Sequence, residues 1–480
     1  MFTHTKEIKT IYVYGPGGLD PLAKNCNNAL AGQALNPVFT EPHITVGIMD
    51  RQHEVSGCLN GDFYGDGFGP VSGRFSVKTI DGKIVFTNEH GYDIIRSPQV
   101  RLTAGNNSTF TLLSVTIGIS FHWERAEDQT FQGNLVFKAR EDGTIAVINE
   151  IPLENYLKSV ISSEMSGNAP VEFLNAQAIM SRSWLLAALS RKKKSKEIPE
   201  SGEREADRED RVVRWYEQED HDLYDVCADD HCQRYQGITK IVSHGAGEAV
   251  QQTSGQVITY GDEICDARYY KACGGITEDF GTAWEDKRIP YLTSISDAPV
   301  FHRPILTEEE AQRWVLSEPD AYCNTKDGGL LETILPDFDR ETQGFFRWKA
   351  EYSREELEGI LREKSGFDFG TLKGIEPLQR GPSGRIFLLK IAGSKRSMVV
   401  GKELEIRRWL SRTHLYSSAF IVKAEYDAHG EIERFVFHGA GWGHGVGLCQ
   451  IGAAVMASKG FGSEEILQHY FPGTEIQRIY

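Results

Sequence analysis

Short β-rich runs separated by turn residues occupy the chain from about residue 41 to residue 150. Clear examples are residues 44–48, 83–87 and 110–113. Pairs such as Asp81-Gly82 and Asp142-Gly143 are typical of the tight turns that join antiparallel strands. The pattern predicts an all-β region over residues 41–150. Residues 1–40 are rich in Gly, Pro, Asn and Ala without a sustained period, so we expect an irregular segment there.

Helical periodicity begins at residue 153. Apolar side chains at the spacing of a buried helical face are Leu153, Leu157, Val160 and Ile161. Glu164 continues this stripe at the next turn. Gly167 and Pro170 then interrupt the helix, and proline suits the first position of a new one. The pattern predicts two consecutive helices, at about residues 153–165 and 170–194.

Glu164 is the position on this stripe that requires an explanation. A carboxylate that faces protein rather than water tends to stay protonated, because burial disfavours its charged form. A general acid that works near neutral pH needs this property. The alternative interpretation is a glutamate that forms a salt bridge with a neighbouring arginine.

The rest of the chain mixes helical and strand patterns. Charged residues dominate positions 191–222, which is typical of a solvated insertion. Strand patterns return at residues 240–270, 385–391 and 420–424, and helical patterns occupy residues 301–370, 447–459 and a short segment before Pro472. We therefore expect an α+β fold with a β-rich N-terminal region, a helical pair that carries Glu164, and a mixed α/β remainder that forms a cleft. The expected segments are 1–40, 41–150, 151–300 with the charged insertion, 301–370 as a helical insertion, and 371–480.

Charge and composition narrow the function. The 480 residues include 52 Lys+Arg and 68 Asp+Glu, and the net charge of −16 disfavours nucleic acid and anionic membranes as partners. No apolar run reaches the ~20 residues of a membrane span. The first residues lack the pattern of a secretory signal, so the chain as written is expected to stay in the cytoplasm. Eight cysteines are too few and too scattered for a disulfide scaffold.

A glycine-rich run at residues 438–450 is the densest motif near the C-terminus. No Gly-Lys-Ser/Thr follows, which excludes a P-loop, and the glycines alternate at every second position, which excludes the dinucleotide fingerprint. Such a backbone can approach a ligand closely, although a tight turn before a helix would explain it equally well. Upstream, Cys273 precedes a Gly-Gly turn, so a hydrolase built on Cys273, His438 and His444 is conceivable. A buried cysteine is the alternative.

Two histidines and two cysteines lie within twelve residues, at His221, Cys227, His231 and Cys232. Such a set commonly holds Zn²⁺ in a tetrahedral site. The spacing differs from that of a standard zinc finger, because His231 and Cys232 are adjacent. A disulfide between Cys227 and Cys232, or free thiols beside solvated histidines, are the other interpretations.

Taken together, four ordered segments resemble the SpoIID/LytB family of peptidoglycan-acting proteins. They are Ile151–Leu157 leading into Ser163-Glu164-Met165, then Leu174–Ala178 with Ser181–Trp184, then Cys273-Gly274-Gly275-Ile276-Thr277-Glu278, and finally Gly441–Ala453. The resemblance spans residues 41–480 and is strongest over 151–300 and 380–480. It implies that Glu164 is the catalytic acid/base, with Ser163 where the family motif has glycine. It also places Arg182 on the arginine of a second catalytic motif.

The resemblance further implies a structural zinc on His221, Cys227, His231 and Cys232. The positions that it assigns to glycan binding are Gln177, Tyr269, Tyr270, Thr277, Glu278, Trp442, His444 and Gln450. Arg182 is expected to orient Glu164 or to bind an acetamido group, and the aromatic side chains to form platforms for sugars.

The activity implied by the resemblance is that of a lytic transglycosylase, which cleaves the β-1,4 bond between N-acetylmuramic acid and N-acetylglucosamine and leaves a 1,6-anhydro sugar. The family also contains non-catalytic amidase enhancers, so a glycan-binding module that activates a cell-wall amidase is the alternative. The expected partners are peptidoglycan glycan strands and a cell-wall amidase. Both readings require an extracytoplasmic location, which conflicts with the missing signal sequence.

Overall fold

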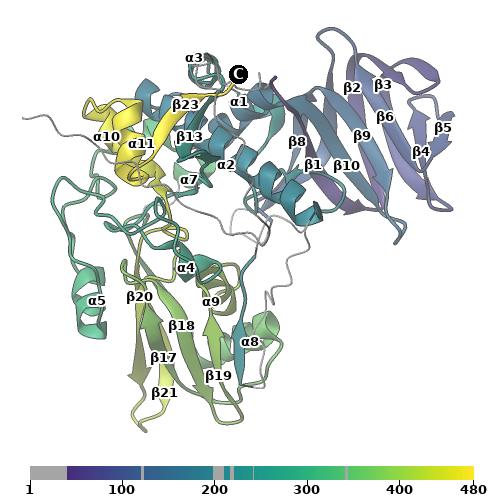
Figure 1. Cartoon of the computed structure of the whole chain (residues 1–480). Coiled ribbons are helices and arrows are strands. Elements are labelled where there is room, and N and C mark those ends of the chain that lie inside the picture. Colours follow the sequence, from purple (N-terminus) through teal and green to yellow (C-terminus); the bar gives the residue numbers. More distant parts are fainter. Residues whose placement is uncertain (1–39, 120–123, 198–209, 217–220, 242, 341–343) are drawn as a thin grey trace, which may run out of the picture. The chain divides into compact units, whose positions relative to one another are not determined.

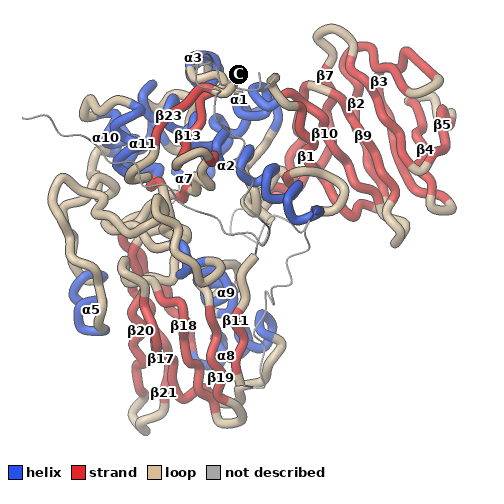
Figure 2. Tube along the Cα trace, in the orientation of Figure 1, coloured by secondary structure: helices blue, strands red, loops and turns tan. Residues whose placement is uncertain are grey.

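The computed structural model describes residues 40–119, 124–197, 210–216, 221–241, 243–340 and 344–480. The irregular segment expected at residues 1–40 therefore lies almost entirely outside the described residues, as do parts of the charged insertion. With 38% strand and 25% helix, the fold is α+β, as the sequence predicted. Figure 1 labels the elements and Figure 2 separates strands from helices and loops.

The β-rich region forms one large sheet. Its strands are β1 (His43–Gln52), β2 (Glu54–Gly65), β3 (Phe68–Ile80), β4 (Lys83–Asn88), β5 (Asp93–Ser97), β6 (Gln99–Ala104), β7 (Thr109–Ile117), β8 (Arg125–Gln132), β9 (Asn134–Ala139), β10 (Ile145–Pro152) and β12 (Val226–Cys227). The main order is β12-β1-β10-β9-β6-β2-β3-β4-β5, and β7 pairs with both β2 and β8. Asp81 and Gly82 both adopt positive φ between β3 and β4, which is the geometry that tight hairpin turns require.

Helix α1 (Leu153–Glu164) follows β10 directly, and α2 (Val171–Glu197) begins after Pro170. The four apolar residues of the α1 stripe, Leu153, Leu157, Val160 and Ile161, are fully buried, as their spacing predicted. Helices α1 and α2 pack against each other and against α3 (Gly245–Gln252). The expectation of strands throughout residues 240–270 was wrong at α3. The residues of this short helix include Ala and Glu, which the strand pattern did not take into account.

Two smaller sheets form most of the remainder. One has the order β11-β19-β18-β17, from Arg211–Val213, Ser397–Gly401, Ile386–Gly393 and Leu372–Arg380. The other has the order β16-β21-β20, from Arg347–Ser353, Ile432–Ala440 and Phe420–Tyr426. Strand β16 falls within the segment expected to be a helical insertion. That segment does contain α5 (Glu308–Val315), α6 (Gly328–Ile334), α7 (Asp337–Arg340) and α8 (Arg354–Ser365).

The C-terminal residues return to the helical pair. A short parallel ladder joins β15 (Tyr269–Tyr270) to β22 (Leu448–Cys449). Helices α10 (Gln450–Ser458) and α11 (Ser463–Tyr470) follow and contact α2. The last strand, β23 (Glu475–Arg478), pairs with β13 (Gln256–Tyr260), which in turn pairs with β14 (Glu263–Ile264). These pairings bring the two distant motif regions of the sequence together.

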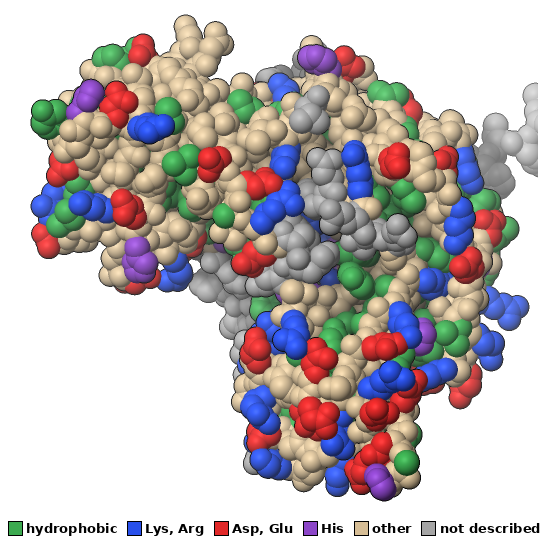
Figure 3. All heavy atoms as spheres, turned by 180° about the vertical axis from the view of Figure 1, so that it is seen from behind, with side chains coloured by type: hydrophobic (Ala, Val, Ile, Leu, Met, Phe, Trp, Pro, Cys, Tyr) green, Lys and Arg blue, Asp and Glu red, His purple; other side chains and the backbone are tan. Residues whose placement is uncertain are grey.

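The buried apolar side chains form two main clusters. One unites the large sheet with α1, α2 and the C-terminal helices. The second lies among β16–β21, α8 and α9 (Glu403–Trp409), and it includes Val212 from β11. Figure 3 shows Lys and Arg side chains interspersed with Asp and Glu over one face. None of the described helices combines the length and the apolar character that crossing a membrane requires.

Candidate active site and metal-ligand group

Glu164 is the last residue of α1, and its side chain is only 7% exposed. Its Oε1 accepts a hydrogen bond from the Tyr269 hydroxyl at 2.8 Å and another from the backbone N–H of Arg234 at 3.0 Å. Burial, followed by the charge of Glu164, raises the pKa of Tyr269 well above its usual value, so this phenol remains a neutral donor. Both bonds fall on one oxygen. Among the described residues, Oε2 has no hydrogen-bond partner.

Fixed charges surround this carboxylate. The ammonium of Lys271 donates to the backbone carbonyl of Glu164 at 2.9 Å and pairs with Asp339 at 2.7 Å. The Arg234 guanidinium pairs with Asp230 at 2.5 Å and with Asp339 at 3.7 Å. The side chains of Arg234, Lys271 and Asp339 are buried, and that of Asp230 is half-buried. Glu164 therefore ends its helix in a preorganised polar network rather than in a simple ion pair.

Among the acidic side chains of this network, Asp230 has the most strongly shifted pKa. Burial raises its pKa to about 7, and the Asp229 and Glu164 carboxylates add to that rise, although the Arg234 guanidinium opposes it. The network around Glu164 thus includes an aspartate whose charge changes near neutral pH.

Arg182 lies at the other end of α1. Its guanidinium makes a two-pronged ion pair with Glu154 at 2.7 and 2.8 Å, and donates to the carbonyl of Gln256 at 2.9 Å. The side chain is fully buried. This placement differs from the expectation that Arg182 orients Glu164. The structure pairs it with the first turn of the helix instead, where it joins α1, α2 and β13.

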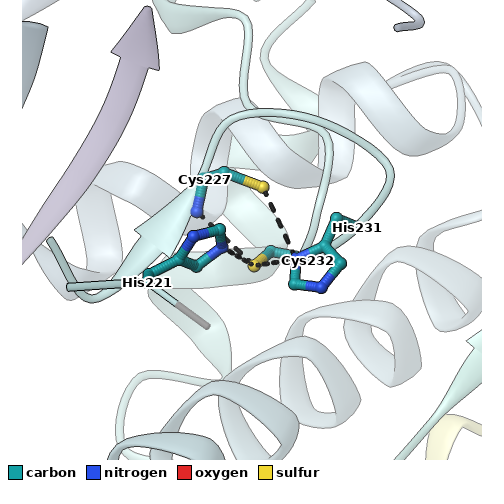
Figure 4. A group of neighbouring side chains, drawn as sticks. All are labelled: His221, Cys227, His231 and Cys232. Carbon is teal, nitrogen blue, oxygen red and sulfur yellow. Dashed lines mark hydrogen bonds between the residues drawn. The ribbon is translucent and has the colours of Figure 1, made fainter. Parts of the chain in front are cut away.

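The four predicted zinc ligands lie together (Figure 4). Their candidate ligand atoms all fall within 4.8 Å of one another. His221 Nε2 is 3.3 Å from Cys232 Sγ, and His231 Nδ1 is 3.5 Å from Cys232 Sγ and 3.9 Å from Cys227 Sγ. A tetrahedral zinc with bonds of about 2.0–2.3 Å places its ligand atoms roughly 3.3–3.8 Å apart, so the donor set fits zinc. Neither cysteine is disulfide-bonded.

The neighbouring side chains favour the thiolate form of Cys227, which is the form that binds metal. A hydrogen bond with Cys232 is the main reason that the pKa of Cys227 lies well below its usual value, and His221 and His231 lower it further against the effect of burial. A lowered pKa favours the thiolate, which is the form that binds metal.

The loop that carries this group also holds Glu164. Cys227 lies in β12 at the edge of the large sheet, where it pairs with Gly47 of β1. Arg234, whose N–H binds Glu164, comes two residues after Cys232. Gln233 between them is fully buried and bonds to Tyr156 of α1 and to Ser181 of α2. Gln233 therefore anchors the segment that joins the metal-ligand group to the Arg234 N–H, which donates to Glu164.

The turn that follows Cys273 is buried rather than open. Glu278 accepts bonds from Ser383 at 2.6 Å and from the Asp279 N–H at 2.8 Å, and burial raises its pKa to about 7. Thr277 bonds to the backbone of Thr293 and Ile295. Both side chains brace the turn and are almost fully buried.

The glycine-rich run owes its alternation to backbone geometry. Positive φ angles occur at Gly441, Gly443, Gly445 and Gly447. A Cβ at Gly445 would come within 2.4 Å of the Arg385 guanidinium, and one at Gly447 within 2.1 Å of a backbone carbonyl. The run therefore needs glycine both for its φ angles and for close packing.

The other positions predicted to bind glycan differ in how far their side chains are buried. Trp442 is half-buried, with its ring 4.4 Å from that of Tyr416. His444 packs between Tyr270 and Trp284, and its Nδ1 accepts from the Val446 N–H at 3.1 Å. Gln177 and Gln450 are buried, and each has a side-chain polar atom without a partner among the described residues.

The residues that sequence reasoning missed are Arg234, Lys271, Asp230 and Asp339. Lys271 directly follows Tyr269 and Tyr270, both predicted from the sequence to bind glycan, so its place in the chain could have indicated a role in the site. Asp339 lies in α7, within the helical insertion, and no local pattern connects it to Glu164. A cavity of about 690 Å³ lies beside the first half of α1, where Glu154, Asn155 and Lys158 line it together with α3 residues.

The sequence of this chain is similar to those of known proteins over the segments that carry these residues. Residues 141–260 match the family model described as Stage II sporulation protein. Stage II sporulation protein D of Bacillus amyloliquefaciens is 23% identical over 330 residues, which cover 68% of this chain and 75% of that protein. The resemblance to the SpoIID/LytB family is confirmed. The SpoIID match contains α1, α2, Glu164, Arg182 and all four residues of the metal-ligand group.

Two further similarities extend the SpoIID relationship. The amidase enhancer of Bacillus subtilis (strain 168) is 24% identical over 242 residues, which are 48% of this chain and 32% of that protein. The chain thus spans only about a third of the length of that relative. An uncharacterized protein of Brachyspira hyodysenteriae is 25% identical over 351 residues, or 72% of each chain. Residues 278–447 also match a domain of unknown function, DUF8618.

Proposed function

We propose that this protein acts on peptidoglycan as a lytic transglycosylase, with Glu164 as its acid/base. The proposal rests on the surroundings of the Glu164 carboxylate. Glu164 ends a buried helix, one oxygen is held by Tyr269 and Arg234, and the other is left without a partner among the described residues. The similarity to Stage II sporulation protein D and to an amidase enhancer supports a role at the cell wall.

One carboxyl group suffices for both steps of the proposed reaction. Protonated Oε2 of Glu164 gives its proton to the glycosidic oxygen as the bond from C1 of N-acetylmuramic acid to that oxygen breaks. The 6-hydroxyl of the same sugar then attacks C1, and the Glu164 carboxylate takes its proton. No water is added, so the second carboxylate of a hydrolysing glycosidase is not needed.

The hydrogen bonds to Oε1 fix the orientation of the Glu164 carboxyl group for both proton transfers. Tyr269 and Arg234 hold the carboxyl plane through one oxygen, and the charges of Lys271 and Arg234 compensate the anion that forms after proton donation. The half-buried Trp442 and Tyr269 are proposed to contact the sugar rings. The remaining positions are proposed to support the site from behind; they are Gln177, Tyr270, Thr277, Glu278, His444 and Gln450. Arg182 is proposed to act on the position of α1, through Glu154.

A zinc ion is proposed to have a structural role in the same site. His221, Cys227, His231 and Cys232 would hold it, and four protein ligands leave no position for substrate. The bound ion would fix the loop from which the Arg234 N–H reaches Glu164. Its contribution is therefore to position the acid rather than to take part in bond cleavage.

A second candidate function is a non-catalytic glycan-binding module that activates a cell-wall amidase. The similarity to an amidase enhancer favours it, as does the small exposed fraction of Glu164. The two functions differ in what they require of the carboxylate, because only the transglycosylase needs Glu164 to exchange a proton.

The deciding experiment compares wild type, Glu164→Gln and Glu248→Gln on purified sacculi and on peptide-free glycan strands. Glu248 is an exposed carboxylate on α3 and provides a control for the same change of charge. Mass spectrometry should find 1,6-anhydro-muramoyl ends with wild type and Glu248→Gln but not with Glu164→Gln. Anhydro ends from Glu164→Gln at the wild-type rate would exclude the acid/base role. Stimulation of an amidase by Glu164→Gln, without anhydro products from any variant, would establish the enhancer function.

A further inference from the structure

A second group of metal-ligating side chains lies apart from the SpoIID match. It consists of Cys273, Asp297, Cys323 and Cys449, whose candidate ligand atoms all fall within 4.8 Å of one another. The residues come from four separate stretches: the turn after β15, a loop before α5, the segment between α5 and α6, and the residue that precedes α10. Each of the four side chains is buried.

The spacing of these atoms suits a single ion. Cys273 Sγ and Cys323 Sγ are 3.4 Å apart, which is far longer than the ~2.05 Å of a disulfide and close to the edge of a tetrahedral metal site. None of the three cysteines is disulfide-bonded. An iron–sulfur cluster distributes its thiolates over several iron atoms, so it needs wider spacing than this group offers.

The surroundings hold the ligands in place. Asp297 accepts a bond from the Tyr470 hydroxyl at 2.5 Å on one oxygen and from the Cys323 N–H at 3.0 Å on the other. The Cys449 sulfur accepts from the Cys273 N–H at 3.3 Å, and the Cys273 sulfur from the Gly275 N–H at 3.2 Å. Such bonds orient metal ligands and still leave carboxylate and thiolate lone pairs for an ion.

The charge balance of the group is compatible with a bound cation. Thiolate and carboxylate groups are costly to bury without a partner of opposite charge, and all four of these side chains are buried. Three thiolates and one carboxylate around a divalent ion leave a charge of −2. Two arginines, the buried Arg385 and the half-buried Arg347, lie close enough to compensate it. Arg385 donates to the Cys273 carbonyl at 3.3 Å, and Arg347 donates to the Gly274 carbonyl at 3.0 Å.

We propose that Cys273, Asp297, Cys323 and Cys449 bind a second structural zinc ion. Three sulfur ligands favour zinc over calcium or magnesium, and four protein ligands in a closed site leave no position for substrate. The ion would join the Cys-Gly-Gly turn to the glycine-rich run and to the segment before α6. It would thereby fix the positions of Glu278 and His444 without contacting the glycan.

The proposal is tested by metal analysis of the full chain, purified under reducing conditions from zinc-supplemented medium. With zinc at both groups, wild type binds two ions per chain. Cys227→Ser/Cys232→Ser removes the first group and should retain one ion, as should Cys273→Ser/Cys449→Ser. Cys265→Ser, a buried cysteine outside both groups, is the matched control and should retain both ions.

The outcomes separate this proposal from the first zinc site. A wild type with one zinc ion, all of it lost in Cys227→Ser/Cys232→Ser, would overturn the second site. One zinc ion that survives Cys227→Ser/Cys232→Ser and is lost in Cys273→Ser/Cys449→Ser would support the second site and contradict the first. Should the Cys273→Ser/Cys449→Ser protein not fold, the count in Cys227→Ser/Cys232→Ser still decides. A Cys273–Cys323 disulfide in peptide maps of the non-reduced wild type would also overturn the proposal.

Discussion

The backbone N–H of Arg234 donates a hydrogen bond to Oε1 of Glu164 across a sequence separation of 70 residues. A backbone donor cannot be removed by changing the side chain, so the loop that carries it determines the position of the candidate acid. Gln233 fixes that loop against α1 and α2, and the neighbouring Cys232 contacts His221 within the metal-ligand group. The metal-ligand group and the carboxylate are thus parts of one arrangement.

Loss of the proposed zinc ion from His221, Cys227, His231 and Cys232 should loosen this donor. In Cys232→Ser, we expect the Arg234 amide to exchange its hydrogen faster, because the loop loses a ligand while α1 remains buried. Hydrogen–deuterium exchange of peptides over residues 228–236 would measure the change, and peptides over 386–393 in β18 would serve as an internal control. Unchanged exchange at 228–236 in a variant that has lost its metal would contradict the link.

Tyr269→Phe should keep the fold and reduce activity. The substitution removes only the hydroxyl that donates to Glu164, so the production of anhydro ends should fall about tenfold, as expected for ~1.4 kcal/mol of a charge-assisted bond. Tyr260→Phe, at an exposed ring in β13, is the control and should leave the rate unchanged. A Tyr269→Phe rate equal to that of wild type would mean that this bond does not position the acid.

Arg182→Ala should act on stability rather than on chemistry. The change leaves the Glu154 carboxylate largely buried without its partner, and breaking a buried pair in this way costs about 3–5 kcal/mol. Urea unfolding would measure the loss. Arg51→Ala breaks an exposed pair with Asp142, whose side chains are 67% and 43% exposed, and should cost less than about 1 kcal/mol. Equal losses in the two variants would show that the Arg182–Glu154 pair does not stabilise the helical pair.

Glu278 should make stability depend on pH. Its pKa is raised from 4.5 to about 7 by burial, so the folded state holds its proton more tightly than the unfolded state. The stabilisation is therefore complete below about pH 4.5 and is lost as the pH rises through about 7. Glutamine does not titrate, so Glu278→Gln should keep its stability as the pH rises while wild type loses stability. Between pH 5 and pH 8 the free energy of unfolding of the variant should therefore rise relative to that of wild type, by up to about 3 kcal/mol. Urea unfolding of both proteins across this range is the measurement, and a constant difference would contradict the shift.

Local patterns predicted much of the fold. The α1 stripe, the hairpin at Asp81 and Gly82, and strands such as β18 follow from periodicity and turn residues, which act over short distances. Helix α3 and strand β16 were missed because their stability comes from neighbours far along the chain. Strand β16, for example, takes its form from pairing with β21.

The candidate site divides in the same way. The four residues between His221 and Cys232 lie close in sequence, so their spacing alone indicated a metal-ligand group. The partner of Arg182 could not be predicted, because two acids on α1 were equally available to a guanidinium on α2. Asp297 and Cys323 gave no signal at all, since each lies alone in its own segment and meets Cys273 only in the folded chain.

Strand β11 has a consequence for how this protein could be divided. Residues Arg211–Val213 lie inside the SpoIID match, yet they form the edge of a sheet whose other strands lie within residues 278–447. Val212 belongs to the core of that second sheet. A cut between the two matched segments would leave one fragment with an unpaired apolar strand and the other with an open edge. The two segments follow one another along the chain but share one sheet, so they are best expressed and exchanged as one unit.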